Sequence, residues 1–355
     1  MSGKEPISYF LGANTAEGFY SLYEEFADAG SGDFVWYIKG GPGNGKSTFM
    51  RRAAAAAEAK GFAVEYAYCS GDPDSLDGIY IRQLHMAYVD ATAPHVQEPE
   101  LFGAAGRYID LSAFYMENAV YDREAIREQS ASYRAQYARA YDLFRAAALS
   151  RPDRIPGLIS EEIRESVCEA GRDLAARHLE HGAGHAEKRR FISAYTCAGR
   201  VFCPGLLLEQ ENVLLLRSAL YLQNDYLQGV RDLCRERGYS VILFPEALCP
   251  SQLEGLCVPE AGLAICAHRK GLVLPGVQVK TLELDGCIPR ERMSSCSEEI
   301  RSGKTACSSL TRQGMDSLAR AKELHDSLEE LYRPAVDFES LERFCKKHIE
   351  QTIGA

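Results

Sequence analysis

The chain has 355 residues, 46% of them hydrophobic, and a formal net charge of −10 at pH 7. This acidic balance argues against a large surface for nucleic acid or anionic membrane, because such surfaces need clustered lysine and arginine. The length suits about two domains. Because we find no signal peptide and no apolar run of about 18 residues, we expect a cytoplasmic protein without a membrane partner.

The first predicted elements are an apolar strand at about residues 34–38, a glycine-rich loop and an Ala-rich helix. The loop and the first residues of the helix read Gly40, Gly41, Pro42, Gly43, Asn44, Gly45, Lys46, Ser47 and Thr48. This run fits the phosphate-binding pattern G-x-x-x-x-G-K-[ST] in its required strand–loop–helix context. Loop N–H groups and the helix N-terminus would hold phosphate oxygens. Lys46 would reach the terminal phosphates and Ser47 would ligate Mg²⁺, so the sequence predicts binding of ATP or another nucleoside triphosphate with Mg²⁺.

Acidic residues follow the next predicted strands, which we place at about 63–69, 86–89 and 107–110. Asp90 ends the second of these, where a P-loop protein holds Mg²⁺ through a strand-end carboxylate; a cap or turn aspartate is the alternative. Asp72 and Asp74 follow the first, at the edge where open α/β sheets bind ligands. We predict that one of them positions the attacking group and acts with Lys46 in catalysis, although Asp-Pro-Asp is also ordinary turn sequence.

A long helix is expected from about 122 to 149. Its tyrosines Tyr133, Tyr137 and Tyr141 recur every four residues, which favours a packing face over a nucleotide-stacking one. A Pro- and Gly-containing stretch at 151–157 breaks the helix. The polar stretch at 182–185 then separates two predicted domains, residues 1–185 and 186–355.

The two predicted domains repeat each other in sequence. The matched segments are 10–18 with 191–199, 34–38 with 213–216, 60–64 with 237–241, 73–78 with 250–255, and 138–143 with 319–324. Each copy is expected to run strand, loop, helix, strand, acidic loop, short helix, strand. This alternation predicts a mainly parallel sheet with helices on both faces.

The second copy has lost the phosphate-binding pattern. When residues 218–225 are laid on the loop, Gln223 replaces a glycine, Asn224 replaces the lysine and Asp225 places an anion at the phosphate position. Like charges about 4 Å apart in a partly buried site repel by several kcal/mol. Residues 301–305 imitate the end of the motif, but no strand precedes them, so we expect part of a helix there.

The motifs at 40–48, 72–78 and 92–95 give the chain a resemblance to a family of uncharacterised bacterial ATPase-like proteins with tandem P-loop domains. The resemblance covers nearly the whole chain. It implies an α/β fold of two tandem P-loop NTPase-like domains, each a mainly parallel sheet flanked by helices, with helical extensions. It also implies ATP binding, and it brings no established substrate with it. Other family members carry an intact loop in the second domain, and this chain departs from them there.

Three functions fit this pattern. The first is slow or partner-stimulated ATP hydrolysis at one site, because Ala91 follows Asp90 where many hydrolysing P-loop proteins have a glutamate. An arginine from elsewhere would then assist, and the candidates are Arg127, Arg134, Arg231 and Arg235. The second is a small-molecule or nucleotide kinase, and the third is a nucleotide-gated binding module without turnover. In each case the second domain would serve interaction or regulation, and the protein or small-molecule client is not specified by the sequence.

Overall fold

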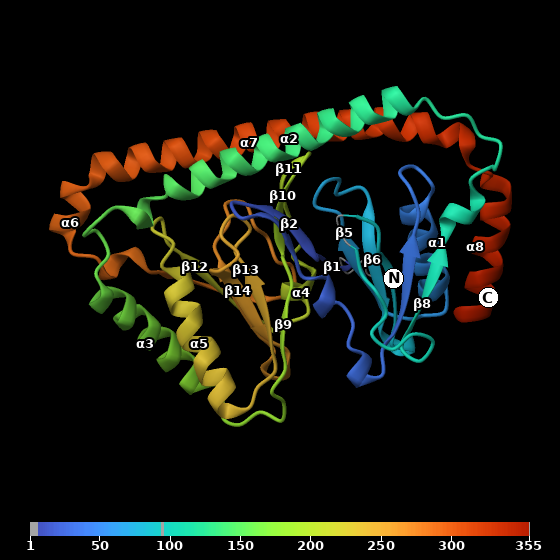
Figure 1. Ribbon diagram of the computed structural model, residues 1–355. Coiled ribbons are helices and arrows are strands. Elements are labelled where there is room, and N and C mark those ends of the chain that lie inside the picture. Colours follow the sequence, from blue (N-terminus) through green and yellow to red (C-terminus); the bar gives the residue numbers. More distant parts are fainter. Residues whose placement is uncertain (1–5, 94–95, 355) are drawn as a thin grey trace.

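Two six-stranded sheets organise the chain, and the computed structural model describes residues 6–93 and 96–354 (Figure 1). The fold is mixed α/β, with mostly parallel strands and helices beside each sheet, as the sequence predicted. Within the described ranges, no helix combines the length and the apolar character needed to cross a membrane.

The first sheet has the strand order β1-β5-β6-β7-β4-β8. Its strands are β1 (Ile7–Phe10), β5 (Val64–Tyr68), β6 (Leu76–Ile81), β7 (Met86–Asp90), β4 (Phe34–Lys39) and β8 (Gly106–Asp110). All neighbours pair in parallel except β6, which is antiparallel to both β5 and β7. Where a short helix was expected between the acidic loop and β7, the buried apolar run of β6 pairs as a strand, and a 3₁₀ turn at Arg82–Leu84 follows it.

The second sheet repeats this order strand for strand, as β9-β13-β14-β15-β12-β16. Its strands are β9 (Glu187–Arg189), β13 (Val241–Pro245), β14 (Leu253–Val258), β15 (Leu263–Ala267), β12 (Asn212–Arg217) and β16 (Gln278–Glu283). The antiparallel strand is again the third one, β14. The internal repeat read from the sequence is therefore a duplication of the whole sheet.

We call the first sheet with the loops between its strands the first half, and the second sheet with its loops the second half. Equivalent residues meet where the two halves join. Phe10 and Phe191 exchange backbone hydrogen bonds, with N–O distances of 2.8 and 3.1 Å. A contact between equivalent positions is what an approximate two-fold axis produces. Two short hairpins flank this point, β2 (Gly12–Thr15) with β3 (Gly18–Ser21), and β10 (Ser193–Thr196) with β11 (Gly199–Phe202).

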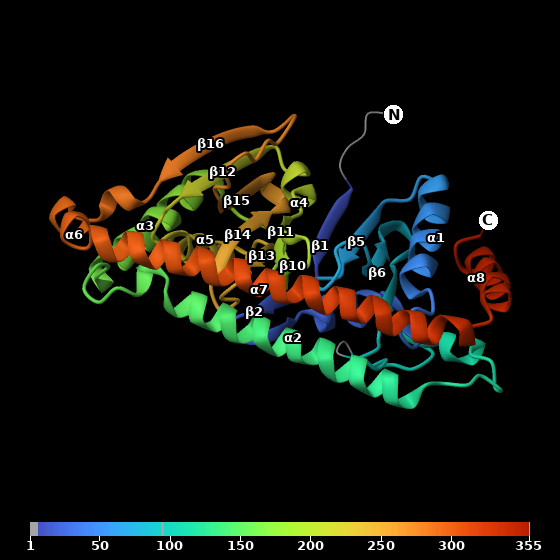
Figure 2. The same ribbon diagram turned by 90° about the horizontal axis from the view of Figure 1, so that it is seen from above.

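Two long helices, α2 (Arg123–Leu149) and α7 (Ser297–Tyr332), lie side by side along one edge of both sheets (Figures 1 and 2). The tyrosine stripe on α2 is a packing face, as predicted. Tyr133 contacts the His325 ring of α7, Tyr137 is half-buried, and the Tyr141 hydroxyl donates to Asn14 Oδ1 at 3.2 Å. Residues 301–305 lie inside α7, so the helical expectation for them is confirmed.

The long helices carry the chain from one half to the other. After α2, helix α3 (Glu161–His178) packs on α5 (Gln223–Arg237) of the second half, where Val167 and Ala175 join its core. After α7, helix α8 (Phe338–Thr352) packs on α1 (Lys46–Ala59) of the first half, with Leu341 and Ile349 in that core. A cut between residues 185 and 186 would leave each sheet without one covering helix.

The layers formed by α1 with α8 and by α3 with α5 each cover one face of a sheet, and among the described residues no second layer of this size, such as the sequence predicted, covers the other face. The other faces contribute to one shared apolar cluster, which includes Val35 and Val89 from the first sheet and Val213 and Cys266 from the second. Two short helices, α4 (Gly205–Leu208) and α6 (Arg290–Ser295), are the remaining α-helices of the described residues. Burying these faces against each other removes the need for a second helical layer.

Candidate functional site

The glycine-rich loop lies at the carboxyl edge of the first sheet. Strand β4 ends at Lys39, residues 40–45 turn, and α1 begins at Lys46. Strand β7 runs parallel beside β4 and ends at Asp90, which is in register with Ile38. The topology therefore brings the predicted loop and the predicted metal carboxylate to the same point.

The loop presents a run of unused hydrogen-bond donors. The backbone N–H groups of residues 43–48 donate to no acceptor among the described residues, and the first helical bond of this region is from Phe49 N to Gly45 O at 2.9 Å. Unpaired N–H groups at a loop and helix N-terminus form a concave site for anions. The N-terminus of α1 also lies here, and its helix dipole adds a partial positive charge to the site.

Loop conformation depends on glycine at particular positions. Gly43 and Gly45 have φ values of 68° and 86°, in the left-handed region that side chains rarely adopt. A Cβ on Gly40 would lie 2.0 Å from the side-chain amide of Asn44. The Asn44 side chain is fully buried. In the amide orientation that satisfies both neighbouring groups, its Nδ2 donates to Gly41 O at 3.0 Å and its Oδ1 accepts from Gly41 N at 3.2 Å.

Lys46 and Asp90 face each other under the loop. The Lys46 ammonium donates to the carbonyl oxygens of Gly40 and Gly41, at 3.1 and 3.0 Å, and lies 3.8 Å from Asp90 Oδ2. The Thr92 backbone N–H and hydroxyl both donate to Asp90 Oδ1, which orients the carboxylate. Residues 94–95, the end of the motif at 92–95, lie outside the described residues.

Ser47 and Asp90 fit a magnesium site of the P-loop kind. The Ser47 Oγ accepts from Leu76 N at 3.0 Å and keeps a further lone pair for a ligand. Among the described residues no group of three or more His, Cys, Asp or Glu side chains could hold a metal. Magnesium bound by one hydroxyl, a carboxylate, water and phosphate oxygens needs no such group.

Asp72 and Asp74 lie beside this site, in the turn before β6. The Asp72 carboxylate accepts from Asp74 N at 3.1 Å and from the Ser75 hydroxyl at 3.0 Å, and it lies 3.5 Å from the ammonium of Lys322 on α7. Asp74 is exposed, and its carbonyl oxygen accepts from Arg51. The contacts of Asp72 hold the turn and join the two halves; positioning of an attacking group stays a prediction.

The end of α7 covers the loop from the second half. A Cβ on Gly43 would lie 3.1 Å from Glu329 Cβ and 3.4 Å from Arg333 Cγ. From the first half, the Tyr115 hydroxyl donates to Pro42 O at 3.2 Å, and the Tyr115 and Tyr332 rings contact each other. Beyond Tyr332 opens a groove of about 330 Å³, which is lined by Tyr121, Arg123, Ile126, Arg127 and Tyr332.

The four arginines named from the sequence have different surroundings. Arg127 lines the groove just described. Arg134 lies on α2. Arg231 and Arg235 both pair with Glu187 at the edge of the second sheet, where they hold β9 against α5.

The equivalent loop in the second half satisfies its own donors. The Asp285 carboxylate accepts from Ala219 N at 2.8 Å and from the Ser218 hydroxyl at 2.6 Å. The Ser218 Oγ in turn accepts from the N–H groups of Leu220 and Leu222, both at 3.1 Å. A carboxylate and a hydroxyl therefore accept from N–H groups of this loop, including that of Leu222, whose counterpart at Gly45 stays unused in the first half.

This loop is one residue shorter than its counterpart, which corrects the alignment made from the sequence. Asn224 Oδ1 accepts from Leu253 N at 2.9 Å, just as Ser47 Oγ accepts from Leu76 N. Asn224 therefore stands at the position of Ser47, and Gln223 stands at the position of Lys46. No residue of the shorter loop supplies the ammonium group.

Sequence reasoning missed a buried carboxylate in each half. Asp77 accepts from the Tyr23 hydroxyl at 2.5 Å, and burial, together with this carboxylate, raises the pKa of Tyr23. The equivalent Glu254 binds Ser193, Arg200 and Arg269. Both positions are acidic at the same spacing in the repeat, and that signal could have found them.

Comparison with known proteins adds no relative: no protein-family model, no curated protein and no solved structure matches the chain.

Proposed function

We propose that this protein binds ATP with Mg²⁺ at a single site in its first half, as a P-loop nucleotide-binding protein. The run of unused N–H groups at residues 43–48 carries the proposal, because it forms an anion site above the Lys46 ammonium. The Ser47 hydroxyl and the Asp90 carboxylate supply the metal ligands. In the second half, Asp285 takes the place of the anion, so one nucleotide per chain is expected.

We propose slow hydrolysis as the reaction. Ala91 is buried, and its N–H donates to Ile38 O at 2.9 Å, so the residue after Asp90 offers no base for water. Hydrolysis then depends on positioning and on charge stabilisation, which gives low basal rates. The unknown client would change the rate by moving the end of α7 that covers the loop.

A kinase is the second candidate, and the groove beside the loop favours it. The groove carries Arg123 and Arg127 next to aromatic rings. Arginine is suited to hold an anionic acceptor through paired hydrogen bonds. Transfer to an acceptor would make ADP formation depend on that added compound, whereas hydrolysis releases phosphate without it.

Calorimetry with Mg·ATP tests the binding proposal, with wild type, Lys46→Ala and Asn224→Ala compared. Removing charge-assisted hydrogen bonds of about 1.5–3 kcal/mol should weaken binding by Lys46→Ala about 10- to 150-fold. Asn224→Ala should bind one equivalent like wild type. Unchanged affinity in Lys46→Ala, or two equivalent sites per chain, would contradict the proposal. ADP release by the same proteins separates turnover from binding alone.

A further inference from the structure

An Arg-Pro pair follows each of the two long helices, one residue later in the second copy than the match of 138–143 with 319–324 requires. Arg151 and Pro152 follow α2, and Arg333 and Pro334 follow α7. In both places a 3₁₀ turn comes next, Pro152–Arg154 in one and Arg333–Ala335 in the other. Because the long helices cross between the halves, each arginine is delivered to the loop region of the opposite half.

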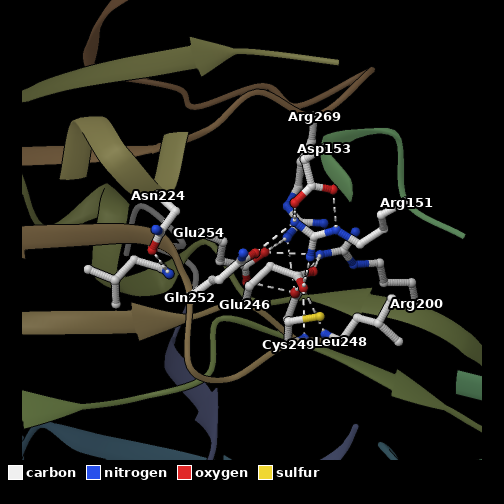
Figure 3. Close-up of polar contacts among 12 residues, drawn as sticks. Arg151, Asp153, Arg200, Asn224, Glu246, Leu248, Cys249, Gln252, Glu254 and Arg269 are labelled. Atoms are coloured by element: carbon white, nitrogen blue, oxygen red, sulfur yellow. Dashed lines mark hydrogen bonds and ion pairs between the residues drawn. The ribbon is translucent and has the colours of Figure 1, made fainter. Parts of the chain in front are cut away.

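In the second half this arginine is locked in place (Figure 3). Arg151 is 2% exposed, and its guanidinium lies 3.5 Å from the ring centre of Tyr221 in the shortened loop. It makes two hydrogen bonds of 3.0 Å to Asp153, one of 2.7 Å to Gln252 and an ion pair of 3.4 Å with Glu246. The positive charge of Arg151 is therefore compensated by partners inside the protein.

In the first half the arginine that follows the long helix has none of these partners. The positions of Glu246 and Gln252 are taken by Cys69 and Ser75, and the residue two places after the arginine is Ala335, where Arg151 is followed by Asp153. Arg333 is exposed, and its side chain makes no hydrogen bond or ion pair with any described residue. Its Cγ would nevertheless be 3.4 Å from a Cβ on Gly43, so the side chain starts directly over the phosphate loop.

Glu329, one helical turn before Arg333 on α7, carries a carboxylate on the same side of the helix. That carboxylate lies 3.6 Å from the His325 Nδ1 and is directed along its own helix. The Lys46 ammonium is held by the carbonyl oxygens of Gly40 and Gly41 and by Asp90. The guanidinium of Arg333 is therefore a second positive group beside the loop, without an ion-pair partner among the described residues, and its planar donors suit phosphate oxygens.

We propose that Arg333 recognises the terminal phosphate of the bound nucleotide and so makes the site prefer a triphosphate over a diphosphate. This inference rests on the proposed nucleotide site. The second half then contributes to the site although its own loop is filled: it supplies the helix that carries Arg333. Arg151 follows the other long helix in a similar place, and its charge is compensated by protein carboxylates.

Calorimetry with two probes, Mg·ADP and the Mg complex of β,γ-imido-ATP, tests the proposal without requiring turnover. Wild type should bind the triphosphate analogue more tightly than Mg·ADP. Arg333→Ala should lose about 10- to 100-fold of affinity for the analogue, because charge-assisted hydrogen bonds are lost, and should bind Mg·ADP within twofold of wild type. Arg333→Lys should keep part of the preference. Arg343→Ala, an exposed arginine on α8 paired with Glu339, is the matched control and should behave as wild type.

The outcomes separate the two proposals. If wild type binds neither probe, the nucleotide site itself is wrong and the role of Arg333 fails with it. If Lys46→Ala weakens both probes while Arg333→Ala binds both as wild type, the site stands and the role of Arg333 is refuted. Equal weakening of both probes by Arg333→Ala also refutes it, because the residue would then support the loop and not the terminal phosphate.

Discussion

His348 makes the docking of α8 on the first half dependent on pH. Its imidazole is 9% exposed and is surrounded by the rings of Trp36, Phe49, Tyr88 and Phe344. Its polar contact is with the Tyr88 hydroxyl at 3.3 Å, which brings no charge. Burial lowers the pKa of His348 from 6.5 to about 4, because the charged imidazolium would lose its hydration there.

The shift sets the size and sign of the effect. In the unfolded chain the imidazole takes up its proton below about pH 6.5, whereas the folded protein takes it up only below about pH 4. Stability from this residue is therefore complete above pH 6.5 and is lost as the pH falls from about 6.5 to about 4. At about 1.4 kcal/mol per pKa unit the full loss is about 3 kcal/mol, of which about 2 kcal/mol is gone by pH 5.

Trp36 provides the assay, because it is the single tryptophan of the chain and its ring centre lies 4.6 Å from that of His348. Urea unfolding followed by Trp36 fluorescence at pH 7, 6 and 5 should show wild type losing about 2 kcal/mol more than His348→Gln over this interval. The glutamine keeps an amide that can bind the Tyr88 hydroxyl. His178→Gln, exposed on α3, is the control and should follow wild type.

Parallel pH profiles for wild type and His348→Gln would refute this reasoning. The imidazole can also be followed directly by nuclear magnetic resonance in the folded protein. A titration midpoint of the native His348 near 6.5 would show that burial does not oppose its charging.

Three further predictions concern the site and the exchanged helices. Leu341→Ala, on α8, should lower the free energy of unfolding by about 2–4 kcal/mol and raise hydrogen exchange in α1, although α1 belongs to the other half. Faster hydrogen exchange confined to the second half would contradict the packing of α8 on the first half. Glu246→Ala should lower the free energy of unfolding by about 3 kcal/mol, measured by urea unfolding, because the buried Arg151 loses a carboxylate; an unchanged midpoint would show that Asp153 suffices. Gly43→Val should abolish Mg·ATP binding in calorimetry, because its φ of 68° excludes a branched side chain; wild-type affinity would mean that this loop conformation is not needed.

Local chemistry explains which parts of this protein the sequence predicts well. The loop at 40–48 follows from spacing alone, because its glycines, Lys46 and Ser47 act within one turn of chain. The strand ending at Asp90 was also found, because an apolar run closed by a carboxylate is a local pattern. Strand β6 was missed, since a short buried run such as 76–81 has no period that distinguishes a strand from a helix.

Helix α3 packs on the second half and α8 on the first, and both depend on contacts between residues far apart in the chain, which no local sequence pattern indicates. One available signal was length: at 1.5 Å per residue, the 27 residues of α2 span about 40 Å, longer than the roughly 30 Å diameter of a small domain. Such a helix must leave its own half. The role of Arg333 needed a second step, because only the comparison with Arg151 shows which partners are missing around it.

The exchange also explains how one copy can lose its loop chemistry while the whole fold persists. Changes in the loop of the second half are compensated locally, because Asp285 and Ser218 accept from the N–H groups that phosphate would otherwise satisfy. Loss of α7 and α8 has no local compensation: Leu341 and Ile349 would leave the core of the first half, and Gly43 would lose its cover. Loop residues of the second half can therefore change without loss of the fold. The helices that reach the first half cannot change as freely, because the first half needs them for its stability. If Arg333 contacts the nucleotide, nucleotide binding constrains changes in α7 as well.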